Sequence, residues 1–393
     1  MDVLQNILIY AGSFVLVLSV VVFVHEFGHF QVARWRGVAI DTFSIGFGKT
    51  LLGWRDKQGV QWKVGALPLG GYVKFADDAD AMSTAPREKI EDPAALAEAR
   101  AKGLFHAQPV STRSMVVAAG PITNFIFSVA AFAAIALMMG RDVTDSDSLP
   151  ARIAVVATGS PAAMAGLQPG DIILSVDGQA TPTFTQLQAA MQRSTQAQVA
   201  LRIDRAGAQQ TLQATPTRQG ETRILGISGP MVLPEERQVI SYDPIQAIGV
   251  GANNTWQIVA QTGSYIGGVF TGRESGDQIA GPLGIINVSG QVATSALSGG
   301  ADGDWGARLG LLALSLLNLA AVLSVAVGIV NLLPIPILDG GHLLFYAIEG
   351  VRGGKPLPPS AQEWAYRAGF AVMASLFLFA TWNDITRLFP GAQ

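Results

Sequence analysis

Residues 20–29 read VVVFVHEFGH, and they complete an apolar run that carries no charge from Ile7 to Val24. A run of this length spans, or nearly spans, a bilayer as a helix. Positions four apart on a helix share one face, so the imidazoles of His25 and His29 can reach the same metal ion. Glu26 stands beside them, where its carboxylate can hold or deprotonate a water. Ionisable groups at the end of an apolar span are costly and usually functional, so we expect a metal site here.

The spacing H-E-x-x-H on a helix is typical of zinc-dependent peptidases, in which the glutamate acts as general base. Five residues can also match by chance, and the alternative is a pair of interfacial histidines at the end of a membrane anchor. A catalytic zinc keeps three protein ligands and one open position. The chain has four histidines and no cysteine, so the third ligand is a histidine, aspartate or glutamate.

The composition indicates several membrane spans. Of 393 residues, 49% are apolar and only 14% are charged, whereas a soluble enzyme carries about a quarter charged residues. The length allows two or three domains. A formal net charge of −3 argues against a nucleic-acid partner, which requires a basic face. The lack of cysteine excludes disulfides and thiolate metal sites.

Three further apolar runs are candidate spans: residues 115–139, 309–333 and 361–382. The last is the weakest, because Glu363 and Arg367 shorten its apolar part. Basic residues follow the first and third spans, and the positive-inside rule places those ends in the cytoplasm. These residues are Arg34, Arg36, Arg352 and Lys355. Both termini are then outside, and the H-E-x-x-H motif is near the cytoplasmic face.

The third apolar run ends in residues 331–342, which read NLLPIPILDGGH. Its two prolines must break the helix, and irregular backbone at membrane depth survives only when it is buried in protein or lines a wet cavity. The topology puts Asp339 and His342 level with His25. The residues favour Asp339 as the third metal ligand and leave His342 as the alternative. His106 is set aside because it lies in a polar loop.

Two segments outside the spans have β character. Residues 43–75 are rich in glycine with short alternating runs, which predict antiparallel hairpins in contact with the membrane or other spans. Residues 159–178 read GSPAAMAGLQPGDIILSVDG, which resembles the middle of a circularly permuted PDZ domain of the type found in bacterial proteases. PDZ domains bind extended peptides at a sheet edge, so this domain either contacts substrate ends or limits access. The helical period of residues 244–270 predicts an amphipathic helix near the outer membrane surface.

The motifs of the chain, taken in order, resemble those of the site-2 protease family of intramembrane zinc metalloproteases, in the branch of the regulator-of-sigma-E proteases. The matching pieces are residues 25–29, Ala119-Gly120-Pro121 with Asn124, the PDZ fragment, residues 281–285 (GPLGI) and residues 331–341. The resemblance implies a zinc ion (Zn²⁺) held by His25, His29 and Asp339, with Glu26 as the catalytic base. It also implies that Asn331 holds substrate backbone.

The same resemblance implies what the chain acts on and where. We expect hydrolysis of peptide bonds within or next to the transmembrane segments of single-span membrane proteins, often anti-sigma factors already trimmed outside by another protease. The location is a bacterial inner membrane, with the lipid bilayer as a partner and no nucleic acid. Residues 43–75 match the position of a membrane-reentrant β-loop, which could pair with an unwound substrate strand. Many relatives carry two tandem PDZ domains, whereas this chain has one such core.

Three other interpretations compete with this one. A non-proteolytic membrane PDZ scaffold with a structural metal predicts that Glu26 is dispensable. A membrane-anchored metalloprotease that cuts soluble periplasmic peptides conflicts with the topology, because the motif lies inside and the PDZ domain outside. A transporter with broken helices requires paired repeat halves, which the sequence lacks.

We therefore predict a polytopic α-helical membrane protein with four transmembrane helices, an inserted β-rich PDZ domain and a small membrane-associated β-hairpin region. The predicted segments are a first span with the H-E-x-x-H motif (1–33), a cytoplasmic loop with reentrant hairpins (34–113), a second span (114–140), a periplasmic PDZ domain (150–217), a periplasmic region with the amphipathic helix (218–304), a third span with the L-D-G motif (305–342) and a fourth span (361–386).

Overall fold

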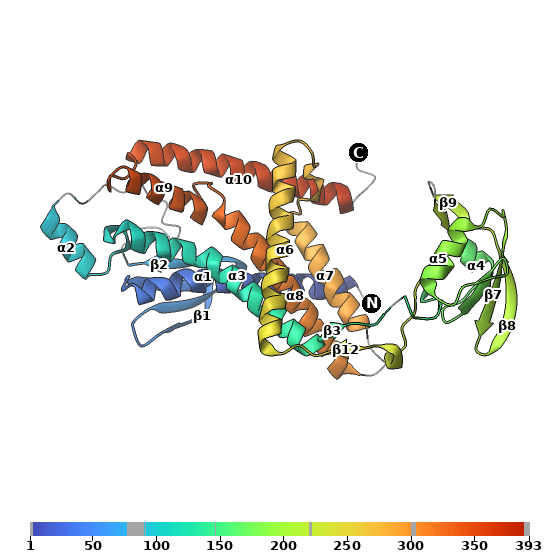
Figure 1. The fold of residues 1–393 in the computed structure, drawn as a ribbon. Helices are drawn as coiled ribbons and strands as arrows, with labels where there is room; N and C mark the ends of the chain where they lie inside the picture. The colour runs from blue at the N-terminus through green and yellow to red at the C-terminus, as the bar shows by residue number, and fades with distance from the viewer. Residues whose placement is uncertain are drawn as a thin grey trace. The chain divides into compact units, whose positions relative to one another are not determined.

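The fold is described by a computed structural model that covers residues 3–76, 90, 92–145, 147–219, 222–299 and 304–388. Residues 77–89 and 91 of the predicted cytoplasmic loop lie outside the described residues. The chain divides into two units. A helical unit combines Met1–Met138 with Asp243–Gln393, and a β-rich unit comprises Met139–Tyr242. Figure 1 traces the elements of each unit.

Within the described residues, four helices are long and apolar enough to cross a membrane. They coincide in number and order with the four predicted spans, and α10 has the lowest mean hydropathy, 1.3 against 2.1 to 2.8 for the others. Their bounds are α1 (Val3–Trp35), α3 (Val110–Met139), α8 (Trp305–Leu332) and α10 (Pro359–Leu388).

Small residues bring the first two of these helices together. A Cβ added at Gly28 of α1 would stand 2.5 Å from the carbonyl oxygen of Ala119 on α3, so the two backbones touch at this point. Helices in an apolar environment associate through such close packing, because burial from water supplies no drive between them. On another face, Val17 and Val21 of α1 pack against α8 through Leu316 and its neighbours.

The loop between α1 and α3 forms a folded β-structure rather than separate small hairpins. Strands β1 (Ile40–Arg55) and β2 (Gln61–Phe75) pair and fold back, so residues 42–45 have partners 61–64 and also partners 71–74. Aromatic side chains hold this structure onto α1, with Phe30 in contact with Phe43 and Trp62 at ring distances of 5.3 and 5.2 Å. The β-structure is therefore fixed to the helix that carries the H-E-x-x-H motif.

Among the residues that the structure describes, the helical unit has four further α-helices, which are shorter or cross the others. They are α2 (Pro93–Ala101), α6 (Pro244–Phe270), α7 (Pro282–Ser298) and α9 (Asp339–Val351). Helix α6 has the bounds expected from its sequence period and begins with a capping box at Asp243. It crosses α3 and α8 (Figure 1), and a Cβ at Gly251 would stand 2.3 Å from the carbonyl oxygen of Val129.

Residues 281–285 (GPLGI) form the N-terminus of α7, and a carboxylate of α10 caps it. Asp384 of α10 is 1% exposed, and its carboxylate accepts hydrogen bonds from the backbone N–H groups of Gly281 at 3.0 Å and Gly284 at 2.8 Å. These are orphan donors at the N-terminus of α7, where negative charge is stabilised. The segment thus joins α7 to α10.

The prolines after α8 break the helix as predicted. Helix α8 ends at Leu332 and α9 begins at Asp339. A Cβ at Gly340 would stand 2.3 Å from the carbonyl oxygens of Leu332 and Leu333, and one at Gly341 would stand 2.3 Å from that of Ile335. The two glycines therefore let α9 start directly against the proline turn.

The β-rich unit is built on one antiparallel sheet in the order β6-β5-β7-β8, with α5 contributing to its core. Its elements are β3 (Arg141–Asp142), β4 (Val155–Val156), α4 (Pro161–Met164), β5 (Ile172–Val176), β6 (Gln179–Ala180), α5 (Phe184–Arg193), β7 (Val199–Arg205), β8 (Ala208–Ala214), β9 (Thr217–Gln219), β10 (Thr222–Ile224), β11 (Ile227–Ser228) and β12 (Val239–Ile240). Ile153, Ile173, Leu201 and Ile203 are fully buried at its centre.

The β-rich unit extends past residue 217, where the sequence suggested that the PDZ segment ends. Strand β11 pairs with β4, and Leu225 is buried in the same core. Arg152 donates to both carboxylate oxygens of Glu236, at 2.8 and 3.1 Å, and these bonds hold the pKa of Glu236 below its usual value. Such short pairings at long sequence separation leave no local pattern in the sequence, so the extent of this unit to Tyr242 follows only from the structure.

Candidate metal centre

His25 and His29 lie one helical turn apart on α1 and point to the same place, as their spacing requires. Their Nε2 atoms are 3.2 Å apart, and their side chains are 10% and 12% exposed. The part of α1 that precedes the pair is apolar, and the helix becomes polar again only at Gln31 and Arg34. The two imidazoles therefore converge at a site where both rings are largely buried.

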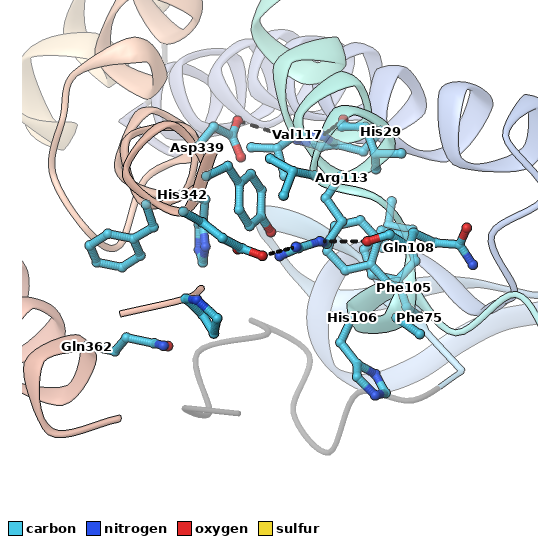
Figure 2. Close-up of a pocket in the computed structure, with 18 of the residues that line it drawn as sticks. His29, Phe75, Phe105, His106, Gln108, Arg113, Val117, Asp339, His342 and Gln362 are labelled. Carbon is cyan, nitrogen blue, oxygen red and sulfur yellow. Dashed lines mark hydrogen bonds and ion pairs between the residues drawn. The ribbon is translucent and has the colours of Figure 1, made fainter. Parts of the chain in front are cut away.

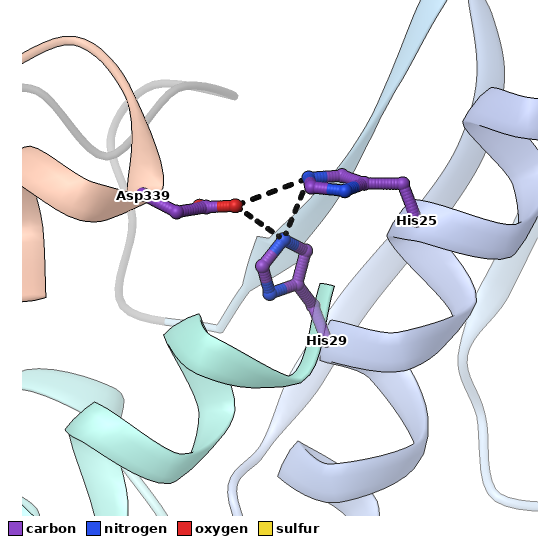
Figure 3. Close-up of side chains that lie close together, drawn as sticks. All are labelled: His25, His29 and Asp339. Carbon is purple, nitrogen blue, oxygen red and sulfur yellow. Dashed lines mark hydrogen bonds and ion pairs between the residues drawn. The ribbon is translucent and has the colours of Figure 1, made fainter. Parts of the chain in front are cut away.

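Asp339 completes the group from the first turn of α9 (Figure 3). Its Oδ2 lies 3.1 Å from His25 Nε2 and 3.4 Å from His29 Nε2. The break in the chain after α8 aims this carboxylate back at α1. His342, the alternative third ligand, lies outside this cluster, and its ring packs beside those of Phe345 and Tyr366.

The geometry of the three atoms fits a zinc ion. Ligand atoms at about 2.0–2.1 Å from zinc in a tetrahedron are about 3.3 Å from one another, and the three separations here are 3.1, 3.2 and 3.4 Å. Apart from the imidazoles, the buried Asp339 Oδ2 has no hydrogen-bond partner. Two nitrogen atoms and a carboxylate oxygen that face one another in this way can be stabilised by a cation at their centre, and a mixed nitrogen and oxygen set suits zinc.

Helix α3 supports both imidazoles from behind. His29 Nδ1 lies 2.8 Å from the carbonyl oxygen of Val116, and His25 Nδ1 lies 3.1 Å from the side-chain amide of Asn124. Between these positions, a Cβ at Gly120 would stand 2.3 Å from His29 Nε2 and 2.9 Å from His25 Cε1. Gly120 thus leaves room for the rings. In the sequence, the feature that corresponds to this support of the imidazoles is Gly120 and Asn124, one helical turn apart in an apolar run.

Glu26 lies next to the ligand pair, between α1 and the end of β2. The backbone N–H of Val73 donates to its carboxylate, and a Cβ at Gly71 would stand 3.0 Å from Glu26 Cγ. The strand therefore passes directly over this side chain. Glu26 is thus held by the β-structure at the side of the three-residue cluster.

A cavity of about 600 Å³ opens beside the cluster and is shared by His25, Glu26, His29 and Asp339. Figure 2 shows His29 and Asp339 at one end of it and His106 and Gln362 at the other. The remaining predicted site residue, Asn331, lines the same cavity from the last turn of α8, although it does not belong to the cluster.

An ion pair crosses the middle of the cavity. Arg113 of α3 donates to Glu349 of α9 at 2.7 Å, and their side chains are 14% and 10% exposed. The Arg113 guanidinium also lies 4.8 Å from the ring centre of Tyr346. The sequence did not single out these residues, because the pair links positions that are far apart in the chain.

Three side chains that could hold a metal ion, an adjacent carboxylate and an open cavity are the parts expected of a hydrolase metal centre, in which one coordination position stays free. Residues 13–376 match the sequence profile of peptidase family M50. The chain belongs to this family, that of the site-2 proteases, and is a zinc-dependent metalloprotease.

Relatives align over almost the whole chain. A protein of Rhizobium meliloti that is named as a zinc metalloprotease is 40% identical over 394 residues, 98% of this chain and 99% of its own length. Metalloprotease MmpA of Caulobacter vibrioides is 38% identical over 97% of this chain and 96% of its own. Regulator of sigma-E protease RseP of Escherichia coli is 30% identical over 96% of this chain and 98% of its own.

Replacing Gly120 by alanine is expected to remove zinc from the protein. The new methyl group would stand 2.3 Å from His29 Nε2, one of the three atoms that would hold the metal. Zinc in protein purified in detergent, measured by mass spectrometry, should fall from about one ion per chain to nearly none. Gly310→Ala on α8 is the control, because a Cβ there has no heavy atom within 4 Å. A zinc-replete Gly120→Ala protein would contradict this geometry.

Replacing Asp339 by alanine is expected to weaken zinc binding more than the same change at His342. Loss of an outer hydrogen-bond partner alone costs about 10–100-fold in metal affinity, so loss of a ligand should cost about 100-fold or more. His342→Ala should leave the affinity unchanged, since its ring packs against Phe345 and Tyr366. Competition with a chromophoric chelator measures both affinities, and the opposite ranking would make His342 the ligand.

Proposed function

We propose that this metalloprotease works inside the membrane, hydrolysing peptide bonds within or next to the transmembrane segments of single-span membrane proteins. The observation that carries the proposal is the position of the zinc-ligand cluster. It forms where α1 meets α3 and the turn after α8, and all three helices are apolar enough to span a bilayer. The 30% identity to the regulator of sigma-E protease supports an inner-membrane protease. We include anti-sigma factors among the proposed substrates.

In this mechanism His25, His29 and Asp339 hold the zinc. A zinc ion bound there would lower the pKa of a water to about 7 and would polarise the scissile carbonyl. Glu26 takes the proton from the attacking water and delivers it to the leaving amine. The backbone N–H of Val73 keeps the Glu26 carboxylate in place for both transfers.

Substrate must also be unwound, because a transmembrane helix hides its peptide groups in its own hydrogen bonds. Residues 71–75 of β2 pair with β1 and run past Glu26. An unwound substrate strand aligned with this segment would exchange helical hydrogen bonds for strand hydrogen bonds. Asn331, which lines the cavity, can hold the substrate backbone with its side-chain amide.

The charge distribution supports one orientation in the membrane. Arg34 and Arg36 follow α1, and Arg352 and Lys355 follow α9, so these ends belong in the cytoplasm. The termini and the β-rich unit are then periplasmic, and the metal centre is near the cytoplasmic face. We assign the β-rich unit as a PDZ domain from its GSPA and GDIILSVDG segments, with the role of contacting substrate ends or limiting access.

Replacing Glu26 by glutamine is expected to stop cleavage while zinc stays bound. The change keeps the shape of the side chain and removes its basicity, and loss of a general base costs about 10²–10⁴-fold in rate. In cells, uncut single-span membrane proteins should accumulate and copurify with the Glu26→Gln protein, to be identified by mass spectrometry. Zinc content is measured on the same samples.

Glu363→Gln on α10 is the matched control, because that side chain is 55% exposed. Normal turnover of a membrane substrate by the Glu26→Gln protein would remove Glu26 from the mechanism and favour a scaffold with a structural metal. Accumulation of soluble periplasmic proteins alone would favour a membrane-anchored protease.

The orientation is tested by fusing a reporter that is active only in the periplasm. Fusion after Ile40 should be inactive, since the chain there has entered the cytoplasm, and fusion after Tyr242 should be active. Reporter activity per fusion molecule is the measurement, with immunoblots to equalise the amounts. Activity at Ile40 would reverse the proposed orientation.

A further inference from the structure

Asn124 has a polar side chain in a buried, apolar environment, where an unpaired polar group is destabilising. It lies in the apolar helix α3 and is 0% exposed, and a buried amide without a partner costs free energy. Its side chain meets His25, with Asn124 Nδ2 3.1 Å from His25 Nδ1. In that orientation the amide oxygen Oδ1 is buried and has no hydrogen-bond partner.

The orientation of this amide is tied to the tautomer of His25. The Nε2 atom of His25 faces Asp339 and His29, so a metal ligand role requires a lone pair on Nε2. A neutral imidazole with a bare Nε2 carries its proton on Nδ1. Nδ1–H is then a donor, and its neighbour must be an acceptor. An amide that presents its NH₂ group instead leaves the proton on Nε2, where it blocks the metal.

We infer that Asn124 is a positioning residue whose Oδ1 accepts the hydrogen bond from His25 Nδ1–H and so fixes the ring and the tautomer that bind zinc. Rotating the amide by half a turn exchanges Oδ1 and Nδ2, which are nearly equal in size, and brings the acceptor to Nδ1. This inference rests on the proposed ligand role of His25.

His29 also has a potential hydrogen-bond acceptor at its Nδ1 atom, but this acceptor belongs to the backbone. His29 Nδ1 lies 2.8 Å from the carbonyl oxygen of Val116, which can only accept. Both acceptors therefore come from α3, one from its backbone and one from a side chain. His29 keeps its acceptor whatever the side chain at position 116, whereas His25 depends on the residue at position 124.

The hydrogen bonds that join α3 to α8 beside Asn124 do not use its side chain. The backbone carbonyl of Asn124 accepts from Ser128 Oγ at 2.9 Å and from Ser324 Oγ of α8 at 3.1 Å. A change of this side chain thus leaves those hydrogen-bonding groups in place. This separates a role in metal binding from a role in filling space.

The test compares Asn124→Leu and Asn124→Asp in the full-length protein purified in detergent. Zinc affinity is measured by chelator competition, and the visible spectrum of the cobalt-substituted protein reports the coordination geometry. Leucine has a similar shape and no acceptor, so affinity should fall about 10–100-fold and the cobalt bands should change. Aspartate always accepts, so its affinity and spectrum should match those of the wild type.

Ser128→Ala is the control, because that hydroxyl bonds the backbone of Asn124 and Ala321 and touches neither imidazole. Thermal unfolding checks that each variant is folded. Wild-type affinity in Asn124→Leu would overturn the inference, and so would an equal loss in a folded Asn124→Asp. If aspartate prevents folding, the contrast between Asn124→Leu and Ser128→Ala decides. A wild-type protein without zinc would instead contradict the proposed ligand set.

Discussion

The backbone contact between α1 and α3 is the constraint on which the metal centre depends. Gly28 lies against the Ala119 carbonyl, and Gly120 lies against the imidazoles of His25 and His29. A side chain at either glycine would separate the helices and move the rings from their acceptors on α3. In an apolar medium the contact is stabilised by packing, which small residues allow. The motif on α1 therefore becomes a site only when α3 is in place.

The third candidate ligand, Asp339, is also positioned relative to α3, but by a different interaction. Asp339 starts α9, and ten residues further along this helix Glu349 pairs with Arg113 of α3 at 2.7 Å. Breaking a pair this deeply buried by removing one partner typically costs about 3–5 kcal/mol, because the remaining charge is uncompensated. Helix α3 thus positions His25 and His29 of α1 through close contact and hydrogen bonds. It positions Asp339 of α9 through the ion pair further along that helix.

Features with a local signature could be predicted from the sequence, and features made by distant pairs could not. The apolar runs, the i, i+4 histidines and the proline break each follow from neighbouring residues, and the helices and the clustering of His25, His29 and Asp339 agree with them. The residues alone left His342 open, since the direction of Asp339 depends on how the turn after α8 packs. The capping of α7 by Asp384, the doubled pairing of residues 42–45 and the extent of the β-rich unit depend on contacts between remote segments.

The metal donors come from opposite ends of the chain, two from the first helix and one from the ninth. A ribosome completes His25 and His29 long before it reaches Asp339, so a growing chain has an incomplete set of candidate donors. Only docking of α9 supplies the missing oxygen. The complete set of three candidate donors therefore exists only in the folded chain.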